Sequence, residues 1–373
     1  MPRTFLSLLV AVVVCRVPPG ALGQEKGSDV FKSGKVLTLH LEIGPKEMDA
    51  LRREPRKYVK ATLKEGDKSY PGVGVHLKGA AGSFRNIDDK ASLTINMDKF
   101  AEGQRFHGLD KFHLANSLQD PSYCAELICG EMFRAAGVPA SRVAHAVVFI
   151  NGKRRGLYYV KEGYDGYFLK AHFNTRKGNF YDGGFLRDID QPLQVLRSKD
   201  DVKDQADLKA LLAAAREPDR KVRFDKLEKL LDLDRFISFL ALEVITWDWD
   251  GYPMNRNNYR VYHDPTRNKI VFIPSGMDQM FGDPNGPILP NFNGFVARSL
   301  METPEGRKRY LTRLGELHRT VLQPEAQAKR LEELQKELQP VLADAAAGLD
   351  VVLAEPGGAR IGGGRHRRIA TAV

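Results

Sequence analysis

The chain has 373 residues, with 57 lysines and arginines against 47 aspartates and glutamates, and a formal net charge of +10. This length suffices for one large domain or two fused lobes, and it excludes a small scaffold held together by disulfides. Two arginines near the N-terminus and four in the Gly-rich segment 360–368 account for much of the excess, and without them the net charge falls to +4. The sequence therefore gives little support for a nucleic-acid-binding surface on the folded part, and we expect no nucleic-acid partner.

Residues 1–23 have the three parts of a secretory signal peptide. Arg3 precedes an apolar run from Phe5 to Val14, and Ala21-Leu22-Gly23 provides a cleavage region. The apolar run is about half as long as a membrane helix requires, and no later segment is apolar enough to span a bilayer. We therefore expect export to the periplasm, the extracellular space or the cell surface, with no membrane span after cleavage.

A sheet-rich first lobe is predicted for residues 36–190, preceded by a flexible polar lead over 24–35. Alternating apolar and polar residues predict strands, and an apolar pattern ended by Gly137 predicts a helix over 122–136. The expected strands are 36–43, 58–66, 70–79, 91–97, 111–117, 144–152 and 156–163, with a tight turn at Asn151-Gly152 between the last two. This mixture of strands and helix is typical of a nucleotide-binding lobe.

The composition becomes mainly helical after residue 190, which predicts a second lobe over 191–350. Helices are expected near 203–215, 224–231 and 235–246, followed by a hairpin of the segments 257–264 and 269–274. Residues 325–346 are expected to form a peripheral helix broken by Pro340. The Gly-rich basic segment 351–373 is predicted to be a disordered tail.

Two cysteines remain once the leader is removed, and they lie five residues apart in the helix expected over 122–136. On a helix this spacing places the Cα atoms beyond the roughly 7 Å limit for a disulfide. We therefore expect Cys124 and Cys129 to be buried and unpaired.

The most informative stretch is "TWDWDGYPMNRNNYRVYHD", where Asp250 follows an apolar helix and Asn255 comes five residues later. This is the acid-to-amide spacing of a kinase catalytic loop. There the aspartate orients the acceptor hydroxyl and takes its proton, and the amide oxygen helps to hold Mg²⁺.

A second acidic loop follows the predicted hairpin. In "IPSGMDQMFG", Asp278 precedes Phe281-Gly282, and in kinases the second magnesium-binding aspartate also follows a hairpin after the catalytic loop. Two acids in this order and setting are more specific than either motif alone.

Taken together, the segments from about residue 36 to 285 resemble the spore coat protein H (CotH) kinase family. The resemblance rests on "LKGAAGSF" at 77, "DKASLTINM" at 89, "FHLANSLQDPSYCAELICGEMFRAAGVPASR" at 112, "INGKRRGLYYVKEGYD" at 150 and the two acidic loops. It implies an α+β, two-lobed fold like that of atypical protein kinases, with a sheet-rich N-terminal lobe and a mainly helical C-terminal lobe. It also implies binding of ATP and magnesium.

The resemblance carries roles to individual residues. Lys90 matches the family lysine that contacts the nucleotide phosphates, and Glu162 matches a glutamate expected to pair with Lys90 or to face the adenine. Lys78, beside Gly79 and Gly82, is a second expected phosphate contact.

Some assignments stay open at this stage. Asn255 fits the kinase spacing, whereas Asn258 fits the family pattern with the tyrosines that follow it, so both are candidate metal ligands with Asp278. Asp248 is a rival to Asp250, which we prefer because Asp248 lies closer to the apolar helix. The family commonly has a further acid two residues before Asp278, where this chain has Gly276.

Three functions are compatible with these residues. The first is an exported, magnesium-dependent kinase that transfers the γ-phosphate of ATP to Ser or Thr of a secreted or surface protein. The second is a catalytically inactive kinase-like surface module with a structural or binding role. The third is a metal-dependent hydrolase that uses Asp248, Asp250 and Asp278. Nothing in the sequence identifies the protein acceptor.

Overall fold

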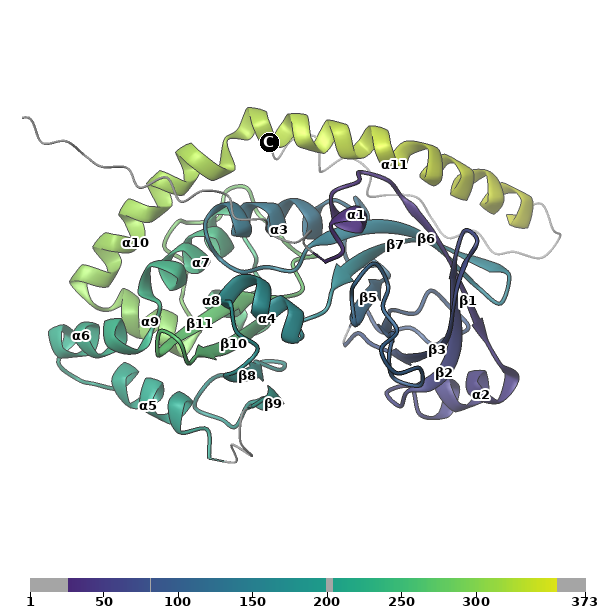
Figure 1. Cartoon of the computed structure of the whole chain (residues 1–373). Coiled ribbons are helices and arrows are strands. Elements are labelled where there is room, and N and C mark those ends of the chain that lie inside the picture. Colours follow the sequence, from purple (N-terminus) through teal and green to yellow (C-terminus); the bar gives the residue numbers. More distant parts are fainter. Residues whose placement is uncertain (1–25, 81, 199–203, 354–373) are drawn as a thin grey trace, which may run out of the picture.

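A computed structural model describes residues 26–80, 82–198 and 204–353. The predicted signal peptide and all but three residues of the predicted C-terminal tail lie outside the described residues. Figure 1 shows a barrel at one end of the molecule and most of the helices at the other. The expected mixture of α and β structure is confirmed.

The first sheet is a closed barrel with the strand order β1-β2-β3-β4-β5-β7-β6. Its strands are β1 (Leu37–Ile43), β2 (Val59–Glu65), β3 (Lys68–Leu77), β4 (Leu93–Asn96), β5 (Lys111–Ala115), β6 (Val143–Ile150) and β7 (Lys153–Glu162). Alternation explains the interior, since Leu39, Leu41 and Ile43 of β1 are buried while the residues between them face outward. A parallel pairing of β1 with β6 closes the barrel, and local sequence patterns did not predict it.

Four helices accompany the barrel strands. They are α1 (Ser28–Phe31), α2 (Pro45–Arg53), α3 (Ala125–Ala135) and α4 (Gly166–Phe173). Residues 26–35 were expected to be a flexible lead, but the structure shows them packed against the barrel. Val30 of α1 is 1% exposed and lies in the barrel core, and the amide of Gly27 donates to the carbonyl of His107 at 2.8 Å. Asp165 starts α4 by accepting hydrogen bonds from the amides of Tyr167 and Phe168.

The rest of the chain combines a small sheet with helices. The sheet has the order β11-β10-β8-β9, from β8 (Asn179–Asp182), β9 (Gln194–Arg197), β10 (Tyr259–Asp264) and β11 (Lys269–Pro274). The helices are α5 (Ala206–Ala215), α6 (Arg220–Leu230), α7 (Leu233–Ile245), α8 (Tyr252–Asn255), α9 (Phe295–Met301), α10 (Pro304–Leu317), η1 (His318–Leu322) and α11 (Pro324–Leu353). One apolar cluster joins α7, α9 and α10 to α3 and the outer face of β7, so the barrel and the helices share a core.

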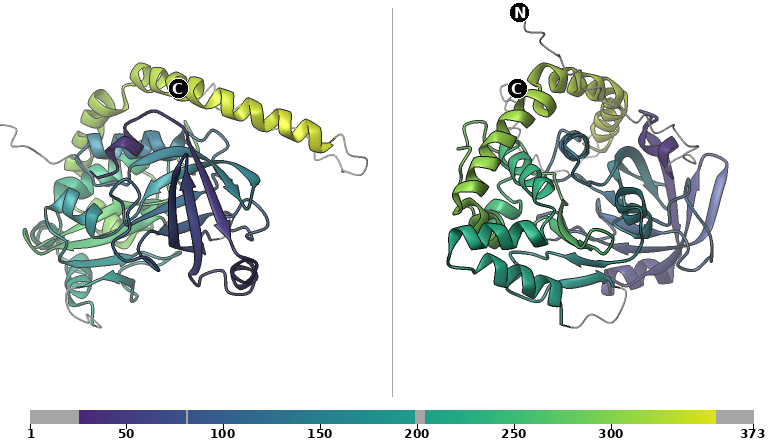
Figure 2. Two further views of the ribbon diagram at one scale, coloured as in Figure 1. Left: turned by 45° about the vertical axis from the view of Figure 1, so that its right-hand side comes forward. Right: turned by 60° about the vertical axis from the view of Figure 1, so that its left-hand side comes forward.

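The long helix α11 lies along the molecule above both the barrel and the other helices (Figures 1 and 2). It continues through Pro340 to Leu353, so the expected break at Pro340 is wrong, and residues 351–353 of the predicted tail are helical. Arg330 of α11 pairs with Glu131 of α3 at 2.9 Å, and Leu334 and Leu338 are buried in the shared core. Among the described residues, no helix is both long and apolar enough to cross a membrane.

Candidate functional site

The first acidic loop is built around the carboxylate of Asp250. The loop leaves the buried helix α7, and three residues around it adopt left-handed backbone angles, namely Trp247, Arg256 and Asn258. Such conformations in residues other than glycine are uncommon and often occur at functional sites. Asp250 is 9% exposed.

Four side-chain amides converge on this carboxylate. Asn255 donates to one oxygen at 2.8 Å, and Asn257 and Asn258 donate to the other at 3.0 and 2.9 Å. Gln279, from the second acidic loop, donates at 3.2 Å. The structure thus brings both competing asparagines to Asp250 and adds Asn257, which was missed because its position fits neither the kinase spacing nor the family pattern.

The second acidic loop lies against the first. The amide of Ser275 donates to the carbonyl of Asn258 at 2.8 Å, which holds the end of β11 beside the Asp250 loop. Burial raises the pKa of Asp278 to about 6, and Glu126 reinforces this effect while Lys161 and Lys78 oppose it. Asp278 therefore interacts electrostatically with three charged residues, Lys78 and Lys161 of the barrel and Glu126 of α3.

Lys161 of β7 and Glu126 of α3 form an ion pair that the sequence did not reveal. Their side chains are 7% and 3% exposed. Burial acts to lower the pKa of Lys161, but the carboxylate of Glu126 outweighs it, and the net shift is upward. Lys161 is therefore a fixed positive charge at this point of the site.

Lys78, the second expected phosphate contact, lies close enough to Lys161, Glu126 and Asp278 to interact with their charges. It follows β3, where its amide donates to the carbonyl of Ser92 at 2.8 Å. Burial and the charge of Lys161 lower the pKa of Lys78 to about 8, and Glu126 and Asp278 oppose the shift.

His113 of β5 lies opposite Lys161 of β7 in the barrel sheet. Its pKa is far below the usual value because of burial and the lysine charges. It is therefore neutral near pH 7.

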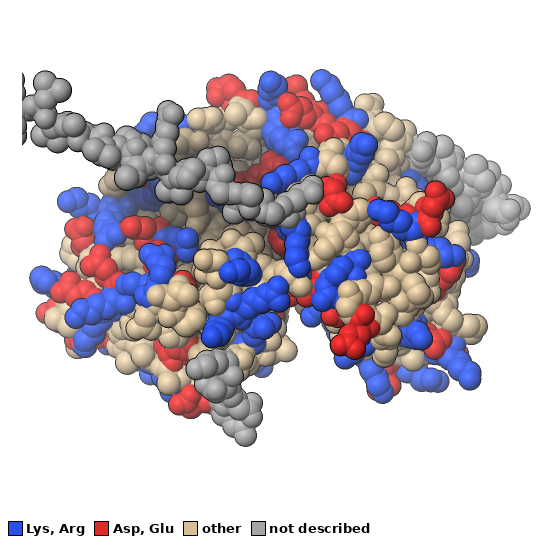
Figure 3. All heavy atoms as spheres, in the orientation of Figure 1, with Lys and Arg blue, Asp and Glu red and all other residues tan. Residues whose placement is uncertain are grey.

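The surface outside this group is basic. Figure 3 shows lysine and arginine side chains gathered over α4 and β10, where the barrel and the helical part meet, and a notch in the outline beside them. This distribution favours an anionic ligand between the two parts.

A sequence model described as "CotH kinase protein" matches residues 75–348. The chain belongs to the CotH kinase family. The match begins within β3 and extends to α11, so β1 and β2 lie outside it and the long C-terminal helix lies inside it.

Curated members of the CotH family are similar over part of their length. Invasin CotH3 of Rhizopus delemar is 28% identical over 254 residues, which cover 63% of this chain and 41% of the relative. Spore coat protein homolog 1 of the same fungus is 23% identical over 285 residues, covering 69% and 44%. Inner spore coat protein H of Bacillus subtilis is 25% identical over 231 residues, covering 57% and 63%. The matches thus span about two fifths of the fungal proteins.

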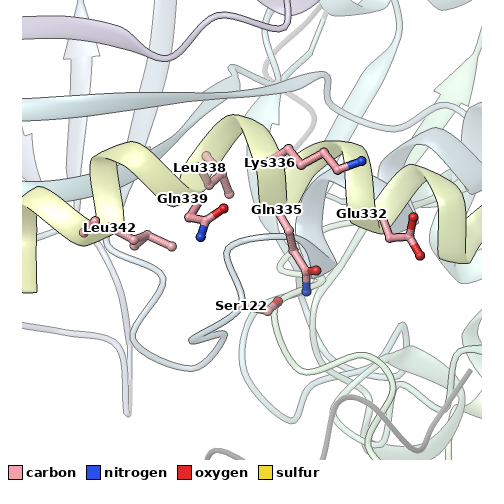
Figure 4. Close-up of a pocket in the computed structure, with 8 residues that line it drawn as sticks. Ser122, Glu332, Gln335, Lys336, Leu338, Gln339 and Leu342 are labelled. Atoms are coloured by element: carbon pink, nitrogen blue, oxygen red, sulfur yellow. The ribbon is translucent and has the colours of Figure 1, made fainter.

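Two CotH-based assignments, Lys90 and Glu162, are not brought to this group. The ammonium of Lys90 donates to the hydroxyl of Tyr123 at 2.5 Å and lies over the rings of Tyr123 and Tyr158. Burial lowers the pKa of Lys90 to about 8. Tyr123 follows Ser122, which faces Gln335 across a groove beneath α11 (Figure 4). The hydrogen-bond partner of Lys90 is therefore next in the chain to a residue that lines the groove beneath α11.

Glu162 forms its ion pair with Arg142, at 2.6 Å and with a second bond at 3.0 Å. The expected pairing of Glu162 with Lys90 is therefore wrong. Lys90 instead lies over the ring of Tyr158, which is on the same face of β7 as Glu162 but four residues away, or about 13 Å along the strand. The neighbouring side chain, Lys161, faces the opposite side of the sheet and pairs with Glu126 of α3. In the described part of the chain, the buried lysine–glutamate pair is Lys161–Glu126.

Asp248 is more deeply placed than its rival Asp250. It is 1% exposed and lies beside Glu243, which is fully buried. Burial, followed by the nearby carboxylates, raises the pKa of both residues well above their usual range. A raised pKa disfavours the ionised form that a general base needs, and this favours Asp250 as the base.

Within the described ranges, no three His, Cys, Asp or Glu side chains come together in a way that could hold a metal ion. A centre formed by the carboxylates of Asp248, Asp250 and Asp278 is therefore not supported. A magnesium site would instead combine Asp278 with amide oxygens and ligand phosphates, a composition typical of Mg²⁺. The two cysteines of the described part are free and buried, as expected.

Proposed function

We propose that this chain is an exported kinase that transfers the γ-phosphate of ATP to a serine or threonine of a secreted or surface protein. The observation that carries the proposal is the position of Asp278. It shares an electrostatic environment with the buried Lys161–Glu126 pair and with Lys78, and Gln279, the next residue, donates to Asp250. These contacts support a site in which a base, a metal-binding acid and cationic side chains come from segments far apart in the sequence.

The residues fit a nucleotide with magnesium. Lys161 and Lys78 supply positive charge for phosphates, and Glu126 keeps Lys161 oriented and charged. Asp278 and the amide oxygens of Asn255 or Asn258 are hard ligands suited to magnesium, which would neutralise negative charge on the transferred group.

Asp250 acts on the acceptor. Its carboxylate is held by amides on both oxygens, so its orientation is fixed before an acceptor arrives. In this position it orients the serine or threonine hydroxyl and takes its proton as the phosphate is transferred. Burial raises the pKa of Asp248 and Glu243 well above the usual range of a carboxyl group, which favours Asp250 as the proton acceptor.

Gly276 favours a second candidate, a catalytically inactive surface module. The family commonly has an acid at this position, but the backbone of Gly276 has φ +71 and an added Cβ would lie 2.7 Å from Oδ1 of Asn258. The relatives named as invasins and spore coat proteins also suggest a role at a surface. With a leader expected over residues 1–23, either function would be performed outside the cytoplasm.

The test is calorimetry of ATP binding, with and without magnesium, to the chain from Gln24 and to its Asp250→Ala and Asp278→Ala variants. We expect magnesium-dependent binding that Asp278→Ala abolishes and Asp250→Ala retains. Transfer to a generic serine-containing protein should fall by about 10²- to 10⁴-fold in Asp250→Ala. An unaltered chain that binds no nucleotide would leave the surface module as the better description.

A further inference from the structure

A basic groove lies where α9 ends and α10 begins, on the helical part of the molecule. It has a volume of about 640 Å³, and its walls come from the loop before α9, the α9–α10 corner and the start of α6. Residues that define it are Arg220, Phe292, Arg298, Met301, Pro304 and Arg307. A neighbouring groove of about 710 Å³ shares Arg220, Thr303 and Pro304 with it, and its walls carry charges of both signs, with Lys221 and Lys308 beside Asp219 and Glu305.

Three arginines of this groove have no acidic partner. Arg220, Arg298 and Arg307 are exposed, and none forms an ion pair with a carboxylate in the described part of the chain. Glu302 also lines the groove, but it is bound to Arg223 at 2.5 Å. The guanidinium of Arg298 lies 5.4 Å from the ring centre of Phe295. The groove therefore presents positive charge over an apolar floor.

The groove begins beside the catalytic loop. The amides of Asn293 and Gly294 both donate to the carbonyl of Pro253, at 2.7 and 3.0 Å, and the side chain of Asn293 donates to the carbonyl of Met254 at 2.6 Å. Pro253 lies three residues after Asp250, so an extended chain between them spans at most about 11 Å. A segment bound in the groove would thus be only a few residues from Asp250.

We propose that this groove binds an acidic segment of the acceptor protein, with aspartate or glutamate about three to six residues from the phosphorylated serine or threonine. The spacing follows from the rise of about 3.3 Å per residue of an extended peptide. Arginine recognises carboxylates through paired hydrogen bonds, and Phe292 and Met301 offer apolar contacts between the charges. This inference rests on the proposed function, because it treats the groove as part of the acceptor site.

The test uses a fluorescein-labelled peptide of about ten residues that contains one serine and a run of glutamates. Its binding is measured by fluorescence anisotropy without nucleotide, beside a peptide with lysines in place of the glutamates. The variants are Arg220→Glu/Arg298→Glu/Arg307→Glu and the milder Arg298→Gln. Lys46→Glu is the control, because Lys46 is an exposed residue of α2 at the barrel end.

We expect the acidic peptide to bind more tightly than the lysine peptide, and to bind less tightly at high salt. The triple variant should bind the acidic peptide about tenfold less tightly, Arg298→Gln should lose a smaller factor, and Lys46→Glu should match the unaltered chain. Three results would overturn the proposal. They are equal binding of the two peptides, unchanged affinity in the folded variants, and stronger competition by a single-stranded oligonucleotide than by the unlabelled peptide. The peptide-binding experiment contains no nucleotide, so its result does not depend on phosphate transfer. A chain that bound the acidic peptide but transferred no phosphate would contradict the proposed function and leave the groove assignment standing.

Discussion

Glu126 of α3 and Lys161 of β7 form an ion pair whose side chains are almost completely buried. The pair joins a helix that packs against the helical part to a strand of the barrel, and it lies within the electrostatic reach of Asp278. It therefore couples the barrel to the second acidic loop.

Lys161→Met should destabilise the protein by about 3–5 kcal/mol, because the carboxylate of Glu126 is left buried without a partner. The double variant Glu126→Leu/Lys161→Met should recover most of that stability, since no isolated charge remains. Chemical denaturation measures both effects. If the double variant also recovered nucleotide affinity, the assignment of Lys161 to the phosphates would be wrong.

Asp278→Asn should stabilise the ligand-free protein at neutral pH while removing magnesium-dependent nucleotide binding. The folded pKa of about 6 is above the unfolded value of 3.8, so ionisation of Asp278 costs stability above pH 6 and costs nothing below about pH 4. Two pKa units correspond to about 3 kcal/mol as an upper figure. The difference from the unaltered chain should thus disappear as the pH falls from 6 to 4.

The measurement is thermal unfolding of both proteins across this pH range, with nucleotide calorimetry at pH 7.5. Ser275→Ala, a partly exposed neighbour in the same loop, serves as the control for local disturbance. A stability difference independent of pH would show that Asp278 is not the titrating group.

Glu162→Gln should weaken the fold and leave nucleotide binding unchanged within about twofold. Glu162 is 4% exposed and neutralises Arg142, so its loss leaves a buried guanidinium that costs about 3 kcal/mol. Parallel denaturation and calorimetry on Glu162→Gln and Glu126→Gln separate the two carboxylates. A large loss of affinity in folded Glu162→Gln would return this residue to the nucleotide site.

Gly276→Asp should not restore the metal affinity expected of the common family sequence. The left-handed backbone at Gly276 costs an aspartate about 1–2 kcal/mol, and its Cβ would meet the side chain of Asn258. Gly276→Ala is the matched control, because it has the same backbone and Cβ costs without the charge. Magnesium titrations should show both variants at or below the unaltered chain, and a gain confined to Gly276→Asp would contradict this account.

The sequence determined the local structure and the order of the acidic loops. Alternation located the strands of the barrel, because a surface with one buried face requires every second residue to be apolar. Asp250 and Asp278 could be proposed as site residues because each follows an element that the sequence predicts, a buried helix or a hairpin, and the structure contains both elements. The match to the CotH family, over residues 75–348, covers both loops.

Only the tertiary structure decided which charged residues meet. Lys161 and Glu162 are adjacent in sequence, yet one pairs with Glu126 and the other with Arg142, because β7 turns neighbouring side chains to opposite faces. The closure of the barrel through β1 and β6, which lie about a hundred residues apart, likewise depends on distant packing. The local sequence pattern specifies helices and strands. The pairing of buried charges is instead fixed by long-range contacts, because these contacts remove both charged partners from water together.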